Sequence, residues 1–174
     1  MKLPEEQRAI EAAFDEYRQW LDRIPDEQFE ATPPGGGWSY AEVYSHILQA
    51  DRSSFMAVDQ CINGNGRDGR LSLVGRYTLL MGKLPPVRMK VPKAAEAASP
   101  AKKITKEEAK NLLIKCRKRL TEVMSRVDKA PRHSRIYHPR MGMLNAGQWL
   151  KFVRIHSQHH LHQLQRIGNK FSRP

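Results

Sequence analysis

Apolar residues recur at helical spacing in four segments of this chain. Over residues 4–23, for example, successive apolar side chains lie three or four residues apart. Such spacing places them on one face of an amphipathic helix. The same period is found in three further segments, so the sequence predicts four helices with one buried face each. These helices cover residues 4–23, 40–62, 106–128 and 146–168.

Three of the predicted helices begin with a capping box. In this motif the side chain of the residue before the helix accepts a hydrogen bond from the backbone three residues later, and the side chain at that later position returns one. The pairs with this spacing are Ser39 with Glu42, Thr105 with Glu108 and, in a weaker form, Asn145 with Gln148. The sequence therefore marks the starts of the second, third and fourth helices.

The connection between the second and third helices is about forty residues long, which is too long for an ordinary loop. Within it, residues 71–83 are compatible with a short helix, whereas the proline-rich residues 85–100 indicate an extended arm. No strand pattern is found anywhere in the chain. We therefore expect an all-α protein, a four-helix bundle formed by a single domain over residues 1–174. A long crossover between helices 2 and 3 would allow these two helices to run parallel.

The composition agrees with a globular protein of one domain. Hydrophobic residues make up 40% of the 174 residues and charged residues 28%. No run of about 18 apolar residues is present, so we expect no membrane span and no membrane partner. The N-terminal residues lack the layout of a signal peptide, which favours a cytoplasmic protein. There Cys61 and Cys116, both within helical patterns, would be reduced and buried.

Charge is distributed unevenly along the chain. Residues 1–63 carry five basic and twelve acidic side chains, whereas residues 64–174 carry 25 basic and six acidic ones. A cationic face has some affinity for phosphate, which raises the question of nucleic-acid binding. However, no aromatic residue that could stack on bases lies between residues 88 and 135. We therefore expect no specific nucleic-acid partner; instead, the acidic first helix would pack beside the basic third helix.

Four histidines crowd into the fourth predicted helix, in the segment RIHSQHHLHQLQRI. Helical projection places His156 and His160 on its apolar face, one turn apart. His159 lies at the margin of that face and His162 points away. Two buried imidazoles one turn apart need hydrogen bonds or a metal ion. Their spacing is that of the HExxH metalloproteases, but Ser157 stands where the catalytic glutamate of that class is found, so we exclude it.

A third metal ligand is available in the second predicted helix. His46 lies near the apolar edge of that helix, where a lone histidine is usually a core residue with satisfied hydrogen bonds. Together with His156 and His160, however, it would complete a set of three imidazoles at one end of a bundle. Three protein ligands with an open fourth position are typical of a catalytic metal site. The open position binds either a water molecule, whose pKa the metal lowers toward neutrality, or a thiolate.

Two segments resemble the DinB-like (YfiT-like) superfamily of metalloenzymes. GGGWSYAEVYSHILQADR is similar to the W-S-x-x-E-v-x-x-H-l element that opens the second helix of that family. HPRMGMLNAGQWLKFVRIHSQHHLHQLQRI is similar to its last-helix element, with a glycine-containing turn, a tryptophan and then H-x-x-H-H-x-x-Q. Together the two elements cover about fifty residues in the expected order.

The resemblance implies a four-helix bundle, often a homodimer, that binds a divalent ion such as zinc or nickel through three histidines. Carried over by position, these are His46, His156 and His160. The family also implies a metal-dependent enzyme acting on a small-molecule substrate, either a transferase that uses a low-molecular-weight thiol or a hydrolase. The alternative is a stress-related bundle that binds a metal or ligand without catalysis, because no obvious acid or base accompanies the histidines.

Three further residues are candidates for a role next to the metal. His159 adjoins the ligand pair. Gln163 lies three residues after a proposed ligand and could hydrogen-bond its ring. His138 precedes the fourth helix and is either a proton carrier above the metal or a turn residue paired with the backbone. In contrast, His133 and His162 are expected to be solvated.

Overall fold

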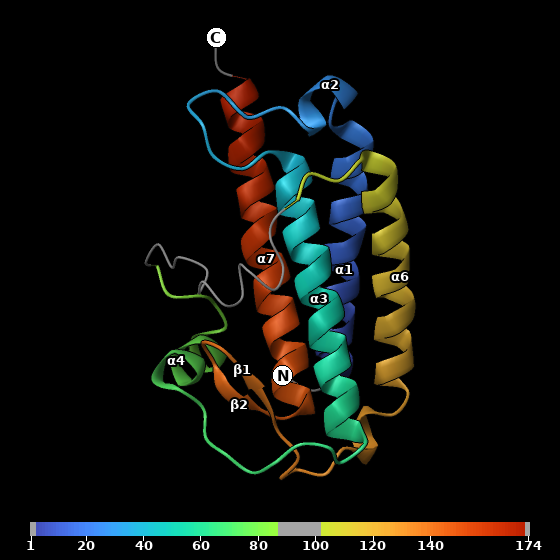
Figure 1. The fold of residues 1–174 in the computed structure, drawn as a ribbon, viewed down its shortest axis with the longest axis vertical. Coiled ribbons are helices and arrows are strands. Elements are labelled where there is room, and N and C mark those ends of the chain that lie inside the picture. The colour runs from blue at the N-terminus through green and yellow to red at the C-terminus, as the bar shows by residue number, and fades with distance from the viewer. Residues whose placement is uncertain (1–2, 87–101, 173–174) are drawn as a thin grey trace.

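The computed structural model describes residues 3–86 and 102–172 of the chain. Four long helices form its body (Figure 1): α1 (Leu3–Arg23), α3 (Tyr40–Ile62), α6 (Lys106–Met124) and α7 (Ala146–Phe171). The shorter elements are α2 (Asp26–Phe29), α4 (Leu73–Met81), the 3-10 helix η1 (Val127–Lys129), and the strands β1 (Ile136–His138) and β2 (Gly142–Leu144). The predicted four-helix bundle is confirmed.

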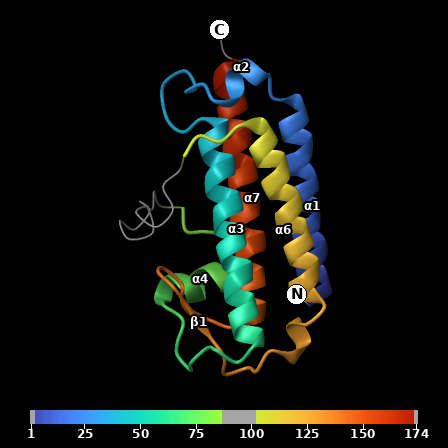
Figure 2. The same cartoon turned by 45° about the vertical axis from the view of Figure 1, so that its right-hand side comes forward.

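The four long helices enclose one core (Figures 1 and 2). α1 and α7 run in one direction, and α3 and α6 run in the other. α7 packs against α1 and α3, and α6 packs against the same two helices. The parallel arrangement of α3 and α6 is the one that the long crossover allows. This crossover contains α4, within the predicted segment 71–83, whereas the predicted extended arm from residue 87 onward lies outside the described residues.

All three predicted capping boxes are present. At the start of α3, the Ser39 amide donates to the Glu42 carboxylate at 2.8 Å, and the Glu42 amide donates back to the Ser39 hydroxyl. Ser39 is fully buried, so this cap holds the first turn of α3 against the core. His46 lies two turns further along the same helix, and its position therefore follows from this cap.

Three details of the sequence prediction are wrong. The sequence predicts a third helix up to residue 128, but α6 ends at Met124 and the chain continues as η1. The fourth helix extends three residues beyond its predicted end, to Phe171. The chain also contains strands, because β1 and β2 pair as an antiparallel hairpin. Gly142 of this hairpin has a φ of 79° and leaves no room for a Cβ, which would come within 2.5 Å of the Ser72 amide nitrogen.

The uneven charge of the sequence is partly neutralised where α1 meets α6. Arg117 of α6 lies 2.5 Å from Asp15 of α1, and Lys110 lies 3.4 Å from Asp22. Both pairs are partly open to solvent, where an ion pair contributes little stability. Their arrangement confirms that the acidic first helix packs beside the basic third one.

The interior of the bundle is apolar apart from a few polar side chains. Its largest fully buried residues include Phe14, Tyr17 and Tyr44. Cys61 and Cys116 are buried free thiols, as predicted. None of the described helices is both long enough and apolar enough to cross a membrane.

The carboxyl group of Asp51, in α3, is buried without compensation. The residue is 1% exposed, and neither carboxyl oxygen has a hydrogen-bond partner among the described residues. Burial raises the pKa of Asp51 well above its ordinary value. Its ionisable neighbours are Tyr17 of α1 and Cys116 of α6, and burial raises the pKa of each of these groups as well. Asp51 therefore keeps its proton in the folded protein over a pH range in which the unfolded chain has lost it.

Asp51→Asn is expected to make the stability of the protein less sensitive to rising pH. In the wild type the carboxyl group contributes stability below its unfolded pKa of about 3.9, and this contribution is lost as the pH rises toward the raised folded pKa. The loss amounts to at most about 1.4 kcal/mol for each pH unit in that window. Urea unfolding at pH 5 and pH 8 should show a larger loss for the wild type than for the variant. Equal losses of stability for the wild type and Asp51→Asn would contradict a protonated Asp51. So would an equally reduced loss in Asp128→Asn, which changes an exposed carboxylate.

Candidate metal centre

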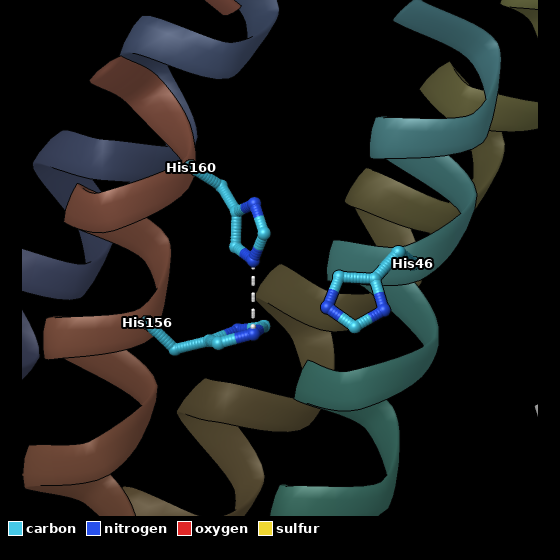
Figure 3. Close-up of side chains that lie close together, drawn as sticks. All are labelled: His46, His156 and His160. Atoms are coloured by element: carbon cyan, nitrogen blue, oxygen red, sulfur yellow. Dashed lines mark hydrogen bonds between the residues drawn. The ribbon is translucent and has the colours of Figure 1, made fainter. Parts of the chain in front are cut away.

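Three histidines from two neighbouring helices meet inside the bundle. His46 comes from α3, and His156 and His160 come from α7; their rings converge in Figure 3. One ring nitrogen of each residue lies within 4.8 Å of those of the other two. The ring centroids of His156 and His160 are 4.4 Å apart, and that of His46 lies 5.2 Å and 4.9 Å from them. The structure thus brings together the three histidines proposed from the sequence.

The two α7 histidines face each other through their Nε2 atoms. These atoms are 3.1 Å apart, the contact drawn as a dashed line in Figure 3. Burial, together with the nearby His46, lowers the pKa of His160 to about 3. Burial and the neighbouring His160 lower the pKa of His156 well below its ordinary value. Both rings are therefore neutral near pH 7, which is the form of imidazole that binds a metal ion.

His46 is the most accessible member of the group. It is half-buried, whereas His156 and His160 are each 7% exposed. Burial lowers the pKa of His46 too, so this ring is also neutral at pH 7. The indole of Trp38 lies edge-on to it, with ring centroids 5.3 Å apart. The histidine group is therefore open to solvent beside His46, next to an aromatic wall.

The surroundings of the α7 histidines differ at their second nitrogen. The Nδ1 atom of His160 lies 2.6 Å from Oε1 of Gln163, so Nδ1 donates and the lone pair of Nε2 faces the other histidines. His156 stacks on the Phe152 ring at 5.4 Å, and its Nδ1 has no partner among the described residues. Three neutral imidazoles, one of them already held in the ligating tautomer, fit a divalent metal ion.

The remaining candidates from the sequence lie at different distances from this group. His159 is exposed, with its ring 5.1 Å from that of His160. His138 does not join the group: its Nδ1 accepts hydrogen bonds from the amides of Arg140 and Met141 at 3.1 and 3.2 Å, and the Phe152 ring lies between it and His156. Burial lowers the pKa of His138 to about 4. This geometry is that of a turn residue paired with the backbone.

Two aromatic neighbours of the site were not among the residues singled out from the sequence. Phe152 precedes His156 by four residues, so the helical period alone places the two rings on the same face of α7. Trp38 directly precedes the cap residue Ser39, and only the fold shows that its indole reaches His46. The contact between Phe152 and His156 could therefore be predicted from the sequence, whereas the contact between Trp38 and His46 could not.

Gln163→Leu is expected to weaken zinc binding by about ten- to hundred-fold, because the carboxamide that orients the His160 ring is lost. Competition with a chromophoric chelator measures the affinity. Gln165→Leu, on the exposed side of the same helix, is the matched control and should bind zinc as the wild type does. Equal affinities for the two variants would show that Gln163 does not support the site.

Comparison with known proteins finds a family model that matches most of the chain. A model of the DinB superfamily matches residues 9–164. The chain is 24% identical over 153 residues to the uncharacterized protein YuaE of Bacillus subtilis (strain 168), a match that covers 88% of this chain and 91% of YuaE.

Two solved structures are similar in fold. TT2238, a four-helix bundle protein, has a TM-score of 0.60 and 20% identity, and the match covers 95% of this chain and 99% of TT2238. YfiT from Bacillus subtilis is described as a probable metal-dependent hydrolase with an unusual four-helix bundle topology. Its TM-score is 0.65 with 14% identity, over 99% of this chain and 89% of YfiT. At these identities the likeness shows the bundle architecture.

Proposed function

Because the chain belongs to the DinB superfamily, we propose that it is a divalent-metal-dependent enzyme acting on a small-molecule substrate, as a hydrolase or a thiol-dependent transferase. The observation that carries this proposal is the convergence of His46, His156 and His160 within 4.8 Å. The description of YfiT as a probable metal-dependent hydrolase supports it. A divalent ion held by these imidazoles, zinc or nickel by the nature of the donors, would supply Lewis acidity.

The residues around the histidines have distinct roles in this proposal. The substrate approaches beside His46, which is the accessible ligand, and its apolar part lies against Trp38. Gln163 keeps the His160 ring in the orientation that turns Nε2 toward the site. His159 is exposed and adjoins His160, so it is placed to exchange a proton with substrate or solvent.

The nucleophile distinguishes the two reactions. A hydrolase uses water, whereas a transferase uses the sulfur of a low-molecular-weight thiol that enters as a second small molecule. The group of ligand atoms that lie within 4.8 Å of one another includes no carboxylate among the described residues, so the proton acceptor in this proposal is His159, whose ring lies 5.1 Å from that of His160. The same absence favours a second candidate function, a metal-binding bundle without catalysis.

Protein purified without an affinity tag and stripped with EDTA tests the proposal. We expect it to take up zinc or nickel and then to turn over a member of one of two panels, small esters and amides, or electrophiles offered with a small thiol. Turnover should be absent from the stripped protein and from His46→Gln, and retained by His162→Ala, which changes an exposed histidine on α7. Metal uptake without turnover of any substrate would favour the non-catalytic alternative. Failure to take up metal would refute both.

A further inference from the structure

A cavity of about 570 Å³ lies between α4 and the N-terminal ends of α1 and α7. None of the three converging histidines lines it. α7 contributes Gly147 and Lys151 to its wall, and at 100° per residue Lys151 points about 140° away from His156. The cavity therefore lies on the opposite side of α7 from the histidines and is a separate space.

The first turn of α7 gives this cavity a positive wall. The amides of Gly147, which lines the cavity, and of the adjacent Ala146 donate to no acceptor among the described residues, whereas that of Gln148 donates to Asn145. They lie at the N-terminus of a helix of 26 residues, where the helix dipole leaves a partial positive charge. Free amides at such an end bind carboxylates and phosphates.

Two cationic side chains strengthen the same wall. Lys151 lies one turn beyond Gly147, and Arg76 approaches from α4. Neither forms an ion pair within the part of the chain that the structure describes. Glu6 is the one acidic residue that lines the cavity, and it is already paired with Arg154. An anionic ligand would therefore find uncompensated positive charge here.

Glu6 provides an independent sign of a ligand. Its side chain is 3% exposed, and Oε2 accepts a hydrogen bond from Nε of Arg154 at 2.7 Å. The other oxygen, Oε1, is buried and has no partner among the described residues, and Glu6 is one of the residues that line the cavity. A buried carboxylate oxygen without a donor is costly, so a ligand that donates a hydrogen bond to it is favoured.

The rest of the wall is apolar. Four leucines from three regions of the chain line it, and one of them, Leu80, is 84% exposed. These leucines are Leu3, Leu71, Leu79 and Leu80. A ligand for this cavity therefore needs an apolar part as well as polar groups, and the volume is in the range of small-molecule sites.

We propose that this cavity is a second ligand site, which takes a small amphipathic carboxylate with a hydrogen-bond donor beside the acid group, as in an apolar α-amino acid. The carboxylate lies at the first turn of α7, between Lys151 and Arg76. The ammonium group faces Oε1 of Glu6, and the apolar side chain lies among the leucines. This site is separate from the metal centre. The proposal of a second ligand site therefore does not depend on the proposed enzymatic function.

Three matched probes test the proposal on the full chain. Phenylalanine carries all three features, 3-phenylpropanoate lacks the amine, and 2-phenylethylamine lacks the carboxylate. In NMR titrations the amides of Ala146 and Gly147 should shift most with phenylalanine, less with 3-phenylpropanoate and not with the amine. Lys151→Ala should weaken phenylalanine binding about tenfold, whereas Lys115→Ala, which removes an exposed charge on α6, should leave it unchanged.

The role of Glu6 has its own test. Glu6→Gln keeps an oxygen acceptor for Arg154 but removes the negative charge, and circular dichroism checks that it folds. It should abolish the preference for phenylalanine over 3-phenylpropanoate and leave the binding of the latter intact or tighter. The proposal is overturned if no probe shifts the two amides, if the amine binds as tightly as phenylalanine, or if Lys151→Ala and Lys115→Ala have the same effect. If folded Glu6→Gln still bound phenylalanine more tightly than 3-phenylpropanoate, Glu6 would not contact the amine and the proposed ligand class would be wrong.

Discussion

Alanine in place of His156 is expected to lower the zinc affinity of the protein by more than about a hundred-fold. Zinc bound by four protein ligands in small peptides is worth about 10–16 kcal/mol, so each ligand contributes about 3 kcal/mol. A three-ligand site has no spare donor, and loss of His156 leaves two of the three converging imidazoles, those of His46 and His160. His46→Ala and His160→Ala should have effects of the same size.

Chelator competition on untagged protein measures these affinities, and circular dichroism confirms that each variant is folded. His162→Ala is the matched control, because it removes an exposed histidine from the same helix. It should bind zinc as tightly as the wild type. If His156→Ala and His162→Ala had equal affinities, the converging histidines would not be the metal ligands.

The histidine group could be predicted from the sequence because its geometry is local. His156 and His160 are one helical turn apart on an apolar face, and the capping box at Ser39 fixes where His46 lies along α3. The remaining step, that α3 lies beside α7, follows from the bundle architecture. Gln163 was open to prediction for the same reason, since it lies three positions after His160 on the same helix.

The hairpin could not be predicted because distant residues define it. Its strands have three residues each, too few for an alternating pattern to be recognised. The turn is held by the crossover before α4, where the Ser72 amide donates to the Met141 carbonyl and the Met143 amide donates to the Arg70 carbonyl. The early end of α6 has a similar cause: Val127 continues the helical period in the sequence, but it reaches the core from η1.

Buried polar groups were missed for a different reason. The sequence marks charged residues as exposed by default, and only the packing of α1 on α7 shows that Glu6 and Arg154 are both inside. Asp51 is hidden in the same way among the helices of the bundle. These groups contribute no hydrophobic signal to the pattern from which the helices are predicted.

Breaking the Glu6–Arg154 ion pair is therefore expected to be among the most destabilising single changes in this protein. Arg154→Ala should lower the free energy of unfolding by about 3–5 kcal/mol, because it leaves a buried carboxylate with no partner for either oxygen. Replacing both residues, Glu6→Leu with Arg154→Met, should restore most of that loss, since an apolar pair of similar volume avoids the desolvation of two charges.

Urea unfolding of the two single variants and the double variant gives the coupling between Glu6 and Arg154. Lys110→Ala is the matched control, because it removes a cation from the exposed pair with Asp22 and should cost about 1 kcal/mol or less. A loss for Arg154→Ala no larger than that for Lys110→Ala would mean that water reaches the Glu6 carboxylate once its partner is gone. Water would then reach the part of the cavity wall beside Glu6, although the Oε1 atom is buried in the wild type.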